Sequence, residues 1–115
     1  MESYNIVFHV NELDKWSMTL ANASNLLIDL ADKDVEVIVL ANGAAVRYYK
    51  TESTEADIEK FTALSEKGVH FTACNNSLKA QNLNKEVLHP FVNVVPAGIT
   101  ELVRKQHEGY AYIKP

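Results

Sequence analysis

The hydrophobic and polar positions of this chain follow two patterns, and the first is typical of strands buried on both faces. Such strands are rich in β-branched and aromatic residues and lack the clean alternation of a half-exposed strand. Five segments have this character: residues 4–10, 35–41, 69–74, 91–95 and 110–113. The turn dipeptide Asn42-Gly43 follows the second segment and Pro96 closes the fourth. The sequence therefore predicts five strands.

The second pattern repeats apolar residues at steps of three and four, as in helices that pack one face on a sheet. Asn11 is the expected cap of the first such helix. The apolar positions of that helix are Leu13, Trp16, Leu20, Ala23, Leu27 and Leu30. In the next helix, Thr54 and Asp57 resemble a capping box and Gly68 follows the last turn. A further helix after Pro96 is expected to place four residues on one face: Ile99, Leu102, Val103 and Gln106.

Two shorter stretches complete the pattern. Residues 75–77 are Asn-Asn-Ser, which favour a helix N-terminus, so a short helix is expected directly after the third strand. Residues 44–53 fit either a packed loop or a short turn of helix. Strands that alternate with helices imply right-handed crossovers and a mostly parallel sheet. The predicted fold is a three-layer α/β/α sandwich with a mostly parallel five-stranded sheet, in a single domain spanning residues 1–115.

Charge and composition narrow the range of functions. The chain has 11 Lys and Arg against 15 Asp and Glu, a net charge of −4, and its basic residues are scattered, which argues against a nucleic-acid partner. The longest apolar stretches are far shorter than the roughly 20 residues that cross a bilayer. The first residues do not form a signal peptide. We therefore expect a cytoplasmic protein with no membrane partner.

Cys74 is the chain's one cysteine, so it cannot form an intramolecular disulfide or a structural zinc site. It ends a predicted strand and precedes a predicted helix N-terminus, where amide groups and the helix dipole favour the nucleophilic thiolate. Cysteine is also among the most buried residue types and often serves as a small apolar group. The residues alone favour packing over chemistry by about two to one.

The other candidate residues also follow strands, since ligand sites of open parallel sheets lie beyond the carboxyl ends of the strands. They are His9, Asn42, Gly43, Asn76, Ser77, Pro96, Ala97 and Gly98. His9 suits proton transfer or ligand orientation, although a structural role is the commoner one for such a histidine. Glu12 either pairs with His9 or complements the dipole of the first helix. The capping residues Asn76 and Ser77 either line a pocket or only begin a helix.

Metal and nucleotide chemistry find no support in the sequence. The histidines are not spaced as metal ligands, and HExxH and CxxC motifs are absent. The small-residue loop at residues 42–45 lacks both of the common glycine patterns that cradle phosphates. We therefore expect no metal and no cofactor.

Three stretches of the chain form a distinctive set: GVHFTACNNSL at residues 68–78, VVPAGI at 94–99 and QHEGYAYI at 106–113, to which NGAAV at 42–46 and His9 add. Together they resemble the small single-domain branch of the DsrE-like family. The resemblance implies an α/β/α fold that assembles as a homo-oligomer, a trimer or a hexamer. It also implies that Cys74 accepts a persulfide sulfur from a donor protein and passes it to an acceptor protein.

The stretch after the cysteine departs from the relay members of that family. Residues 79–82 read Lys-Ala-Gln-Asn with one charge, where relay members often have a small-residue run followed by basic residues. Three functions stay open: sulfur transfer through Cys74, non-catalytic binding of a small molecule, and thiol redox sensing in an oligomer of the same fold. The four tyrosines that either cover the core or form an oligomer interface are Tyr48, Tyr49, Tyr110 and Tyr112.

Overall fold

A computed structural model describes residues 2–52 and 57–115 of the chain. Its central feature is a five-stranded sheet in which every strand pair is parallel. The strands are β1 (Ser3–Val10), β2 (Asp34–Ala41), β3 (His70–Cys74), β4 (Asn93–Val95) and β5 (Ala111–Ile113). Their order across the sheet is β4-β3-β2-β1-β5. The predicted fold class is confirmed.

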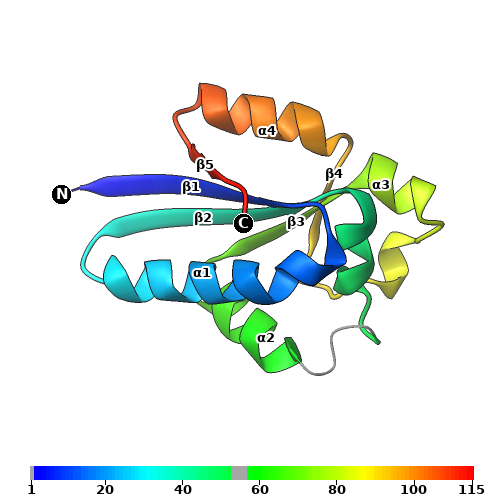
Figure 1. Ribbon diagram of the computed structural model, residues 1–115, viewed down its shortest axis with the longest axis horizontal. Coiled ribbons are helices and arrows are strands. Elements are labelled where there is room, and N and C mark those ends of the chain that lie inside the picture. The colour runs from blue at the N-terminus through cyan, green and yellow to red at the C-terminus, as the bar shows by residue number, and fades with distance from the viewer. Residues whose placement is uncertain (1, 53–56) are drawn as a thin grey trace.

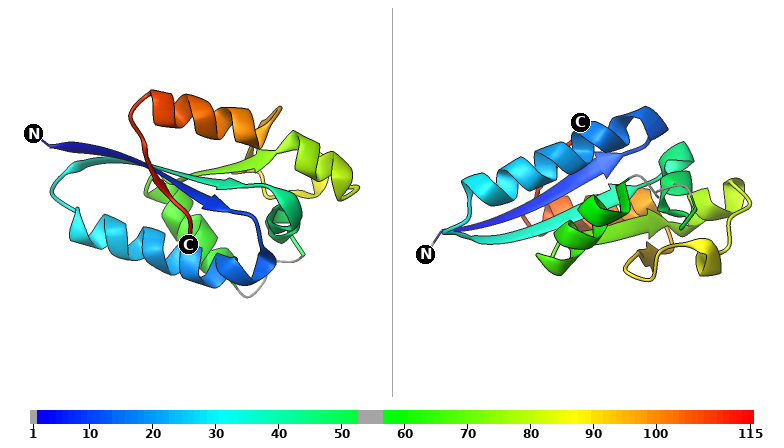
Figure 2. Two further views of the ribbon diagram at one scale, coloured as in Figure 1. Left: turned by 45° about the horizontal axis from the view of Figure 1, so that its top comes forward. Right: turned by 90° about the horizontal axis from the view of Figure 1, so that it is seen from below.

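Helices cover both faces of this sheet (Figure 1). On one face lie α1 (Trp16–Asp29) and α2 (Ile58–Glu66), and on the other lies α4 (Gly98–His107), as the rotated views in Figure 2 also show. The short helix α3 (Asn75–Ala80) follows β3 directly, as predicted. Among the described residues, 3₁₀ segments include η1 (Leu13–Lys15), η2 (Gly43–Tyr49) and η4 (Lys85–Val87).

The larger core lies between the sheet and the α1–α2 layer, and aromatic side chains dominate it. Trp16, Phe61 and Phe71 are fully buried, and the Phe61 and Phe71 ring centroids are 4.9 Å apart. Tyr49 is also fully buried and donates its hydroxyl to the Thr72 carbonyl at 3.0 Å. Of the four tyrosines with two possible roles, Tyr49 thus covers the core. Because the buried Tyr49 hydroxyl has a hydrogen-bond partner, its burial avoids the cost of an unpaired polar group.

A smaller core lies under α4 and is formed by Val7, Ile38, Leu40 and Leu102. Successive residues of a strand point to opposite faces, so these strand residues alternate with those of the larger core. Of the four residues expected to share one face of this helix, Leu102 is buried, whereas Ile99 and Val103 are 64% and 62% exposed. The α4 helix therefore turns apolar side chains outward.

Helix starts and strand lengths differ from the predictions. Asn11 does not cap α1: its side chain accepts from Lys114 at 3.1 Å, and η1 leads into the helix. The expected capping box falls partly on Thr54, which lies outside the described residues. The fourth strand begins at Asn93 rather than at residue 91.

The ambiguous residues 44–53 lie mostly in η2. This 3₁₀ segment holds three buried side chains, Ala45, Val46 and Tyr49, against the larger core. Packing rather than local propensity therefore decides the conformation of this stretch.

Candidate functional site

The strand order places Cys74 at a switch in the path of the chain. The connection after β3 passes on the α1–α2 side, where Leu78 of α3 joins the larger core. The connection after β4 leads instead to α4 on the opposite face (Figure 1). Cys74 pairs with Val95 in register, so it ends its strand beside this divergence. Ligand sites of open parallel sheets lie at such points.

Hydrogen-bonding groups at the starts of two helices act on the pKa of the Cys74 thiol. Cys74 is 5% exposed. Burial raises the pKa of its thiol, but the Ser77 hydroxyl and the backbone N–H groups of Gly98, Ser77 and Asn76 lower it by donating to the sulfur. The net effect is a pKa below the ordinary value of a cysteine. Donors that converge on a sulfur stabilise the thiolate, which is the nucleophilic form.

The loop after β2 holds the Ser77 hydroxyl in place. The backbone N–H of Gly43 donates to Ser77 Oγ at 2.7 Å. A hydroxyl that accepts one hydrogen bond retains a single proton to donate, and the acceptance polarises that proton. Gly43 therefore holds the hydroxyl that lowers the pKa of Cys74, and the loop after β2 is tied to α3 by the same bond.

Gly98 allows the start of α4 to approach the thiol. A Cβ at this position would lie 2.9 Å from Cys74 Cβ and 3.4 Å from Cys74 Sγ. Real Cβ atoms essentially never come within 3.0 Å of another such atom. Glycine is thus the residue that lets this backbone N–H reach the sulfur.

His9 forms a second polar group on the same edge of the sheet. Its side chain is 8% exposed, with Nδ1 2.6 Å from Tyr112 Oη and Nε2 2.8 Å from Asn42 Oδ1. Glu12 is not among these partners and its side chain is exposed, so the alternative in which it pairs with His9 is wrong. His9 on β1 and Cys74 on β3 are separated by β2, about 10 Å between strand axes. His9 is therefore too far away to take the thiol proton directly.

The remaining predicted site residues sit around these two groups. Asn76 reaches the sulfur through its backbone, while its side chain is exposed. Pro96 is exposed and Ala97 is half-buried in the turn that leads into α4. Sequence reasoning missed Tyr112 as a partner of His9. No local signal in the sequence could have found it, because residue 112 reaches the face of His9 only through the pairing of β5 with β1.

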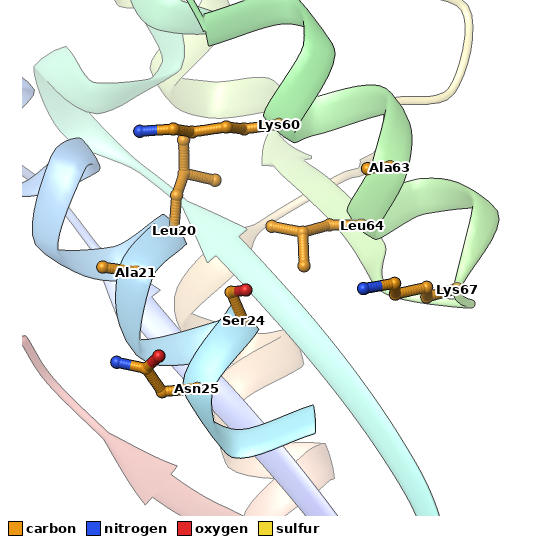
Figure 3. A pocket seen from close by; sticks show the side chains of 8 residues that line it. All are labelled: Leu20, Ala21, Ser24, Asn25, Lys60, Ala63, Leu64 and Lys67. Carbon is orange, nitrogen blue, oxygen red and sulfur yellow. The ribbon is translucent and has the colours of Figure 1, made fainter. Parts of the chain in front are cut away.

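A groove in the described part of the chain lies away from the thiol. It occupies about 340 Å³ between α1 and α2, on the opposite face of the sheet from α4 (Figure 3). Its lining residues are Leu20, Ala21, Ser24, Asn25, Lys60, Ala63, Leu64 and Lys67. None of the residues around the thiol lines this groove.

Residues 2–52 and 57–115 contain neither a metal-ligand cluster nor a helix suited to a membrane. Among these residues, no three His, Cys, Asp or Glu side chains gather as potential metal ligands. Within the same residues, no helix has the length and apolar character needed to span a membrane.

Comparisons with solved structures show the same fold in other proteins. A protein of unknown function, MTH1491 from Methanobacterium thermoautotrophicum, is 32% identical, with a TM-score of 0.88 over 97% of this chain and 99% of that chain. The ychN protein from E. coli is 15% identical with a TM-score of 0.70, over 97% and 99% of the two chains. The conserved protein of unknown function BT1422 from Bacteroides thetaiotaomicron is 14% identical with a TM-score of 0.71, over 96% and 94%. The last two likenesses show the fold alone.

Sequence comparison gives the family. No functionally curated protein matches the chain. The sequence pattern of the DsrE/DsrF-like family matches residues 6–115, which include all five strands except the start of β1, and the thiol edge. This chain belongs to the DsrE/DsrF-like family.

Proposed function

We propose that this protein is a cytoplasmic sulfur carrier in which Cys74 accepts a persulfide sulfur and passes it on. The observation that carries the proposal is the set of donors on the Cys74 sulfur, namely the Ser77 hydroxyl and the N–H groups of Asn76, Ser77 and Gly98. Such donors favour an anionic sulfur, which is the state that attacks a sulfur donor. Membership of the DsrE/DsrF-like family is consistent with sulfur relay.

The proposed step is a displacement at sulfur without net oxidation or reduction. The Cys74 thiolate attacks the outer sulfur of a donor persulfide, R–S–SH. A new S–S bond forms between Cys74 and the outer sulfur as the S–S bond of the donor breaks, and R–S⁻ leaves with the electron pair. The Cys74 persulfide then loses its proton to water, because persulfides are stronger acids than thiols. In the transfer to an acceptor, the thiolate of the acceptor attacks the outer sulfur of the Cys74 persulfide, and the Cys74 thiolate leaves.

A carrier of this kind needs no general base next to the thiol. The pKa of Cys74 is already lowered, after the opposing effect of burial, by the donors of α3 and α4. His9 lies two strands away and contacts Tyr112 and Asn42 instead. A thiolate present at neutral pH reacts without prior proton removal. The site therefore fits sulfur transfer better than a Cys-His hydrolytic mechanism.

Partners of the carrier would meet it at the carboxyl edge of the sheet. We include in the proposal a donor protein and an acceptor protein, together with assembly of this chain as a trimer or hexamer. Ile99 is exposed and directly follows Gly98, whose N–H donates to the Cys74 sulfur. An apolar surface thus begins at the residue that follows Gly98, close to the thiol. Such a surface suits protein contacts near the transferred sulfur.

The proposal is tested by loading the folded protein with inorganic polysulfide and measuring its intact mass. We expect the wild type to gain one sulfur atom and Cys74→Ser to gain none while keeping the same circular dichroism spectrum. The thiol of the unloaded protein, titrated by pH-dependent alkylation, should have a pKa below the ordinary cysteine value, as the surrounding donors require. A wild-type protein that gains no sulfur would refute the carrier role. Ready oxidation by peroxide without sulfur uptake would instead favour redox sensing.

A further inference from the structure

Asn42 and Cys74 are neighbours across the carboxyl edge of the sheet. The parallel register pairs Ala41 of β2 with Ala73 of β3, so the next residue on each strand faces the other. The backbone stays extended at Asn42, with φ −137° and ψ 178°, and its N–H donates to the Val10 carbonyl at 3.1 Å. Adjacent strands lie about 4.8 Å apart. Asn42 therefore stands about one strand spacing from Cys74.

The two side chains also share a face of the sheet. Leu40 belongs to the core under α4, so Asn42, two residues further along, is directed to the same side. On β3, Phe71 and Ala73 belong to the larger core on the opposite face, which leaves Cys74 on the α4 side. Asn42 and the thiol thus face the same space beside the start of α4.

A directed chain of hydrogen bonds fixes the orientation of the Asn42 amide. Asn42 Oδ1 can only accept, so His9 Nε2 carries the proton and donates to it over 2.8 Å. In the neutral ring Nδ1 then accepts from the Tyr112 hydroxyl over 2.6 Å. The chain runs from β5 through β1 to the end of β2. It holds the amide oxygen toward β1 and turns the amide nitrogen away from His9.

The amide nitrogen of Asn42 has free donors. The hydrogen bond to His9 engages the amide oxygen, and within the described residues no bond of Asn42 Nδ2 to another group is found. Every solvent-shielded side-chain nitrogen or oxygen of those residues has a partner. The Nδ2 atom is therefore open to solvent and able to donate to a ligand.

We propose that the Asn42 amide nitrogen binds the outer sulfur of a Cys74 persulfide, and that His9 and Tyr112 are positioning residues that keep the amide turned toward it. This inference rests on the proposed function. The outer sulfur sits about 2 Å beyond Sγ, and it carries the negative charge of the persulfide. The donors from Asn76, Ser77 and Gly98 are directed at Sγ itself. The outer atom needs a donor of its own, and Asn42 supplies one at the same edge.

The test compares the acidity of the loaded and the unloaded sulfur. Inorganic polysulfide, Sₙ²⁻, transfers one sulfur to the Cys74 thiolate and leaves as Sₙ₋₁²⁻, so loading requires no partner protein. Alkylation rates against pH then give the acid dissociation constant of the thiol before loading and of the persulfide after loading. We expect Asn42→Ala to lower the constant of the persulfide about tenfold, since a hydrogen bond to an anion is lost, and to leave that of the thiol unchanged.

Tyr112→Phe should lower the acid dissociation constant of the persulfide by a smaller factor, about threefold, because the Asn42 amide is then free to rotate. In the double variant Tyr112→Phe/Asn42→Ala the effect should equal that of Asn42→Ala alone, since Tyr112 acts through Asn42. Tyr4→Phe is a matched control, because Tyr4 is 38% exposed against 40% for Tyr112 and bonds to Glu2 instead. Asn25→Ala on the exposed side of α1 is the control for the amide.

The possible failures are distinguishable. If the wild type gains no sulfur, the carrier function fails. If the wild type loads but Asn42→Ala leaves the persulfide constant unchanged, the role of Asn42 is refuted and the carrier function stands. If Asn42→Ala moves the thiol and the persulfide equally, Asn42 acts on the whole thiol pocket, and the specific role at the outer sulfur is also refuted.

Discussion

At the scale of single residues, the lowered pKa of Cys74 depends on groups that also take part in the local structure of the fold. Ser77 is the side chain among them, and Gly43 fixes its rotamer by donating to Ser77 Oγ. The other donors are backbone N–H groups at the starts of α3 and α4, which the helices leave without intrahelical partners. The thiol thus uses donors that the fold would otherwise leave to solvent.

Ser77→Ala removes the side-chain donor and leaves the backbone ones. Burial still opposes ionisation, so the pKa of Cys74 rises in the variant. Its alkylation rate at pH 7 should fall about tenfold, the usual effect of losing a hydrogen bond to a charged group. Ser24→Ala on α1 is the matched control and should react as the wild type does. An unchanged rate in Ser77→Ala would show that the backbone donors alone set the reactivity.

Sequence reasoning located the thiol and His9 because both follow strands, and strand ends are readable from apolar runs. It could not decide whether Cys74 is packed or reactive, since that depends on Gly98, which is 24 residues away in the chain and approaches the sulfur through the topology. The partners of His9 were equally hidden. Tyr112 joins it because β5 pairs with β1, and strand order is not encoded in local pattern.

At the scale of elements, the C-terminal end of α4 is tied to the sheet through Tyr110. Its hydroxyl donates to Glu36 Oε2 of β2 at 2.8 Å, and Lys105 lies 5.3 Å from its ring centroid. Burial raises the pKa of Tyr110 to about 12, and the hydrogen bond to Glu36 and the charges of Glu36, Glu108 and Glu101 add to the effect. The neutral phenol is therefore the form that the folded state prefers.

This preference predicts a loss of stability at high pH. The folded protein keeps the phenol proton when the unfolded chain, with a pKa near 10.0, has released it. The unfolded state then binds fewer protons, so the free energy of unfolding falls as the pH rises from about 10 towards 12. Urea unfolding should show a shallower decline in Tyr110→Phe than in the wild type over this range. Parallel declines in the two proteins would contradict the assignment.

The elements themselves were largely predictable, and the exceptions have a common physical cause. Local sequence patterns predict the strands buried on both faces and the end of α2 at Gly68. The structure confirms both predictions. The start of α1 and the conformation of residues 43–49 do not follow such rules. There, Trp16 donates its indole N–H to the Ala45 carbonyl at 2.9 Å and Tyr49 is buried against β2 and β3. Tertiary contacts override the capping preference of Asn11.

At the scale of the whole molecule, the two faces of the sheet are covered unequally. The α1–α2 layer encloses the large aromatic core, whereas α4 covers a small cluster around Leu40 and Leu102. Ile99 and Val103, four residues apart on α4, form an exposed apolar stripe. Tyr112, beside His9 on the same face, is 40% exposed. The less covered face is therefore also the one that presents the thiol edge.

If a second copy of the chain packs on this stripe, assembly depends on Ile99 and Val103. We expect light scattering to give the mass of an oligomer for the wild type and that of a monomer for Ile99→Asp/Val103→Asp, because two charges would be buried without partners at the interface. The exposed positions of both side chains predict that the variant monomer keeps its fold. Ile28→Asp on α1, at a residue that is 67% exposed, is the control and should remain oligomeric. A monomeric wild type, or assembly lost only in Ile28→Asp, would show that α4 is not the contact surface. Because Ile99 adjoins Gly98, an interface on this stripe would also lie next to the start of α4, where the Cys74 sulfur is held.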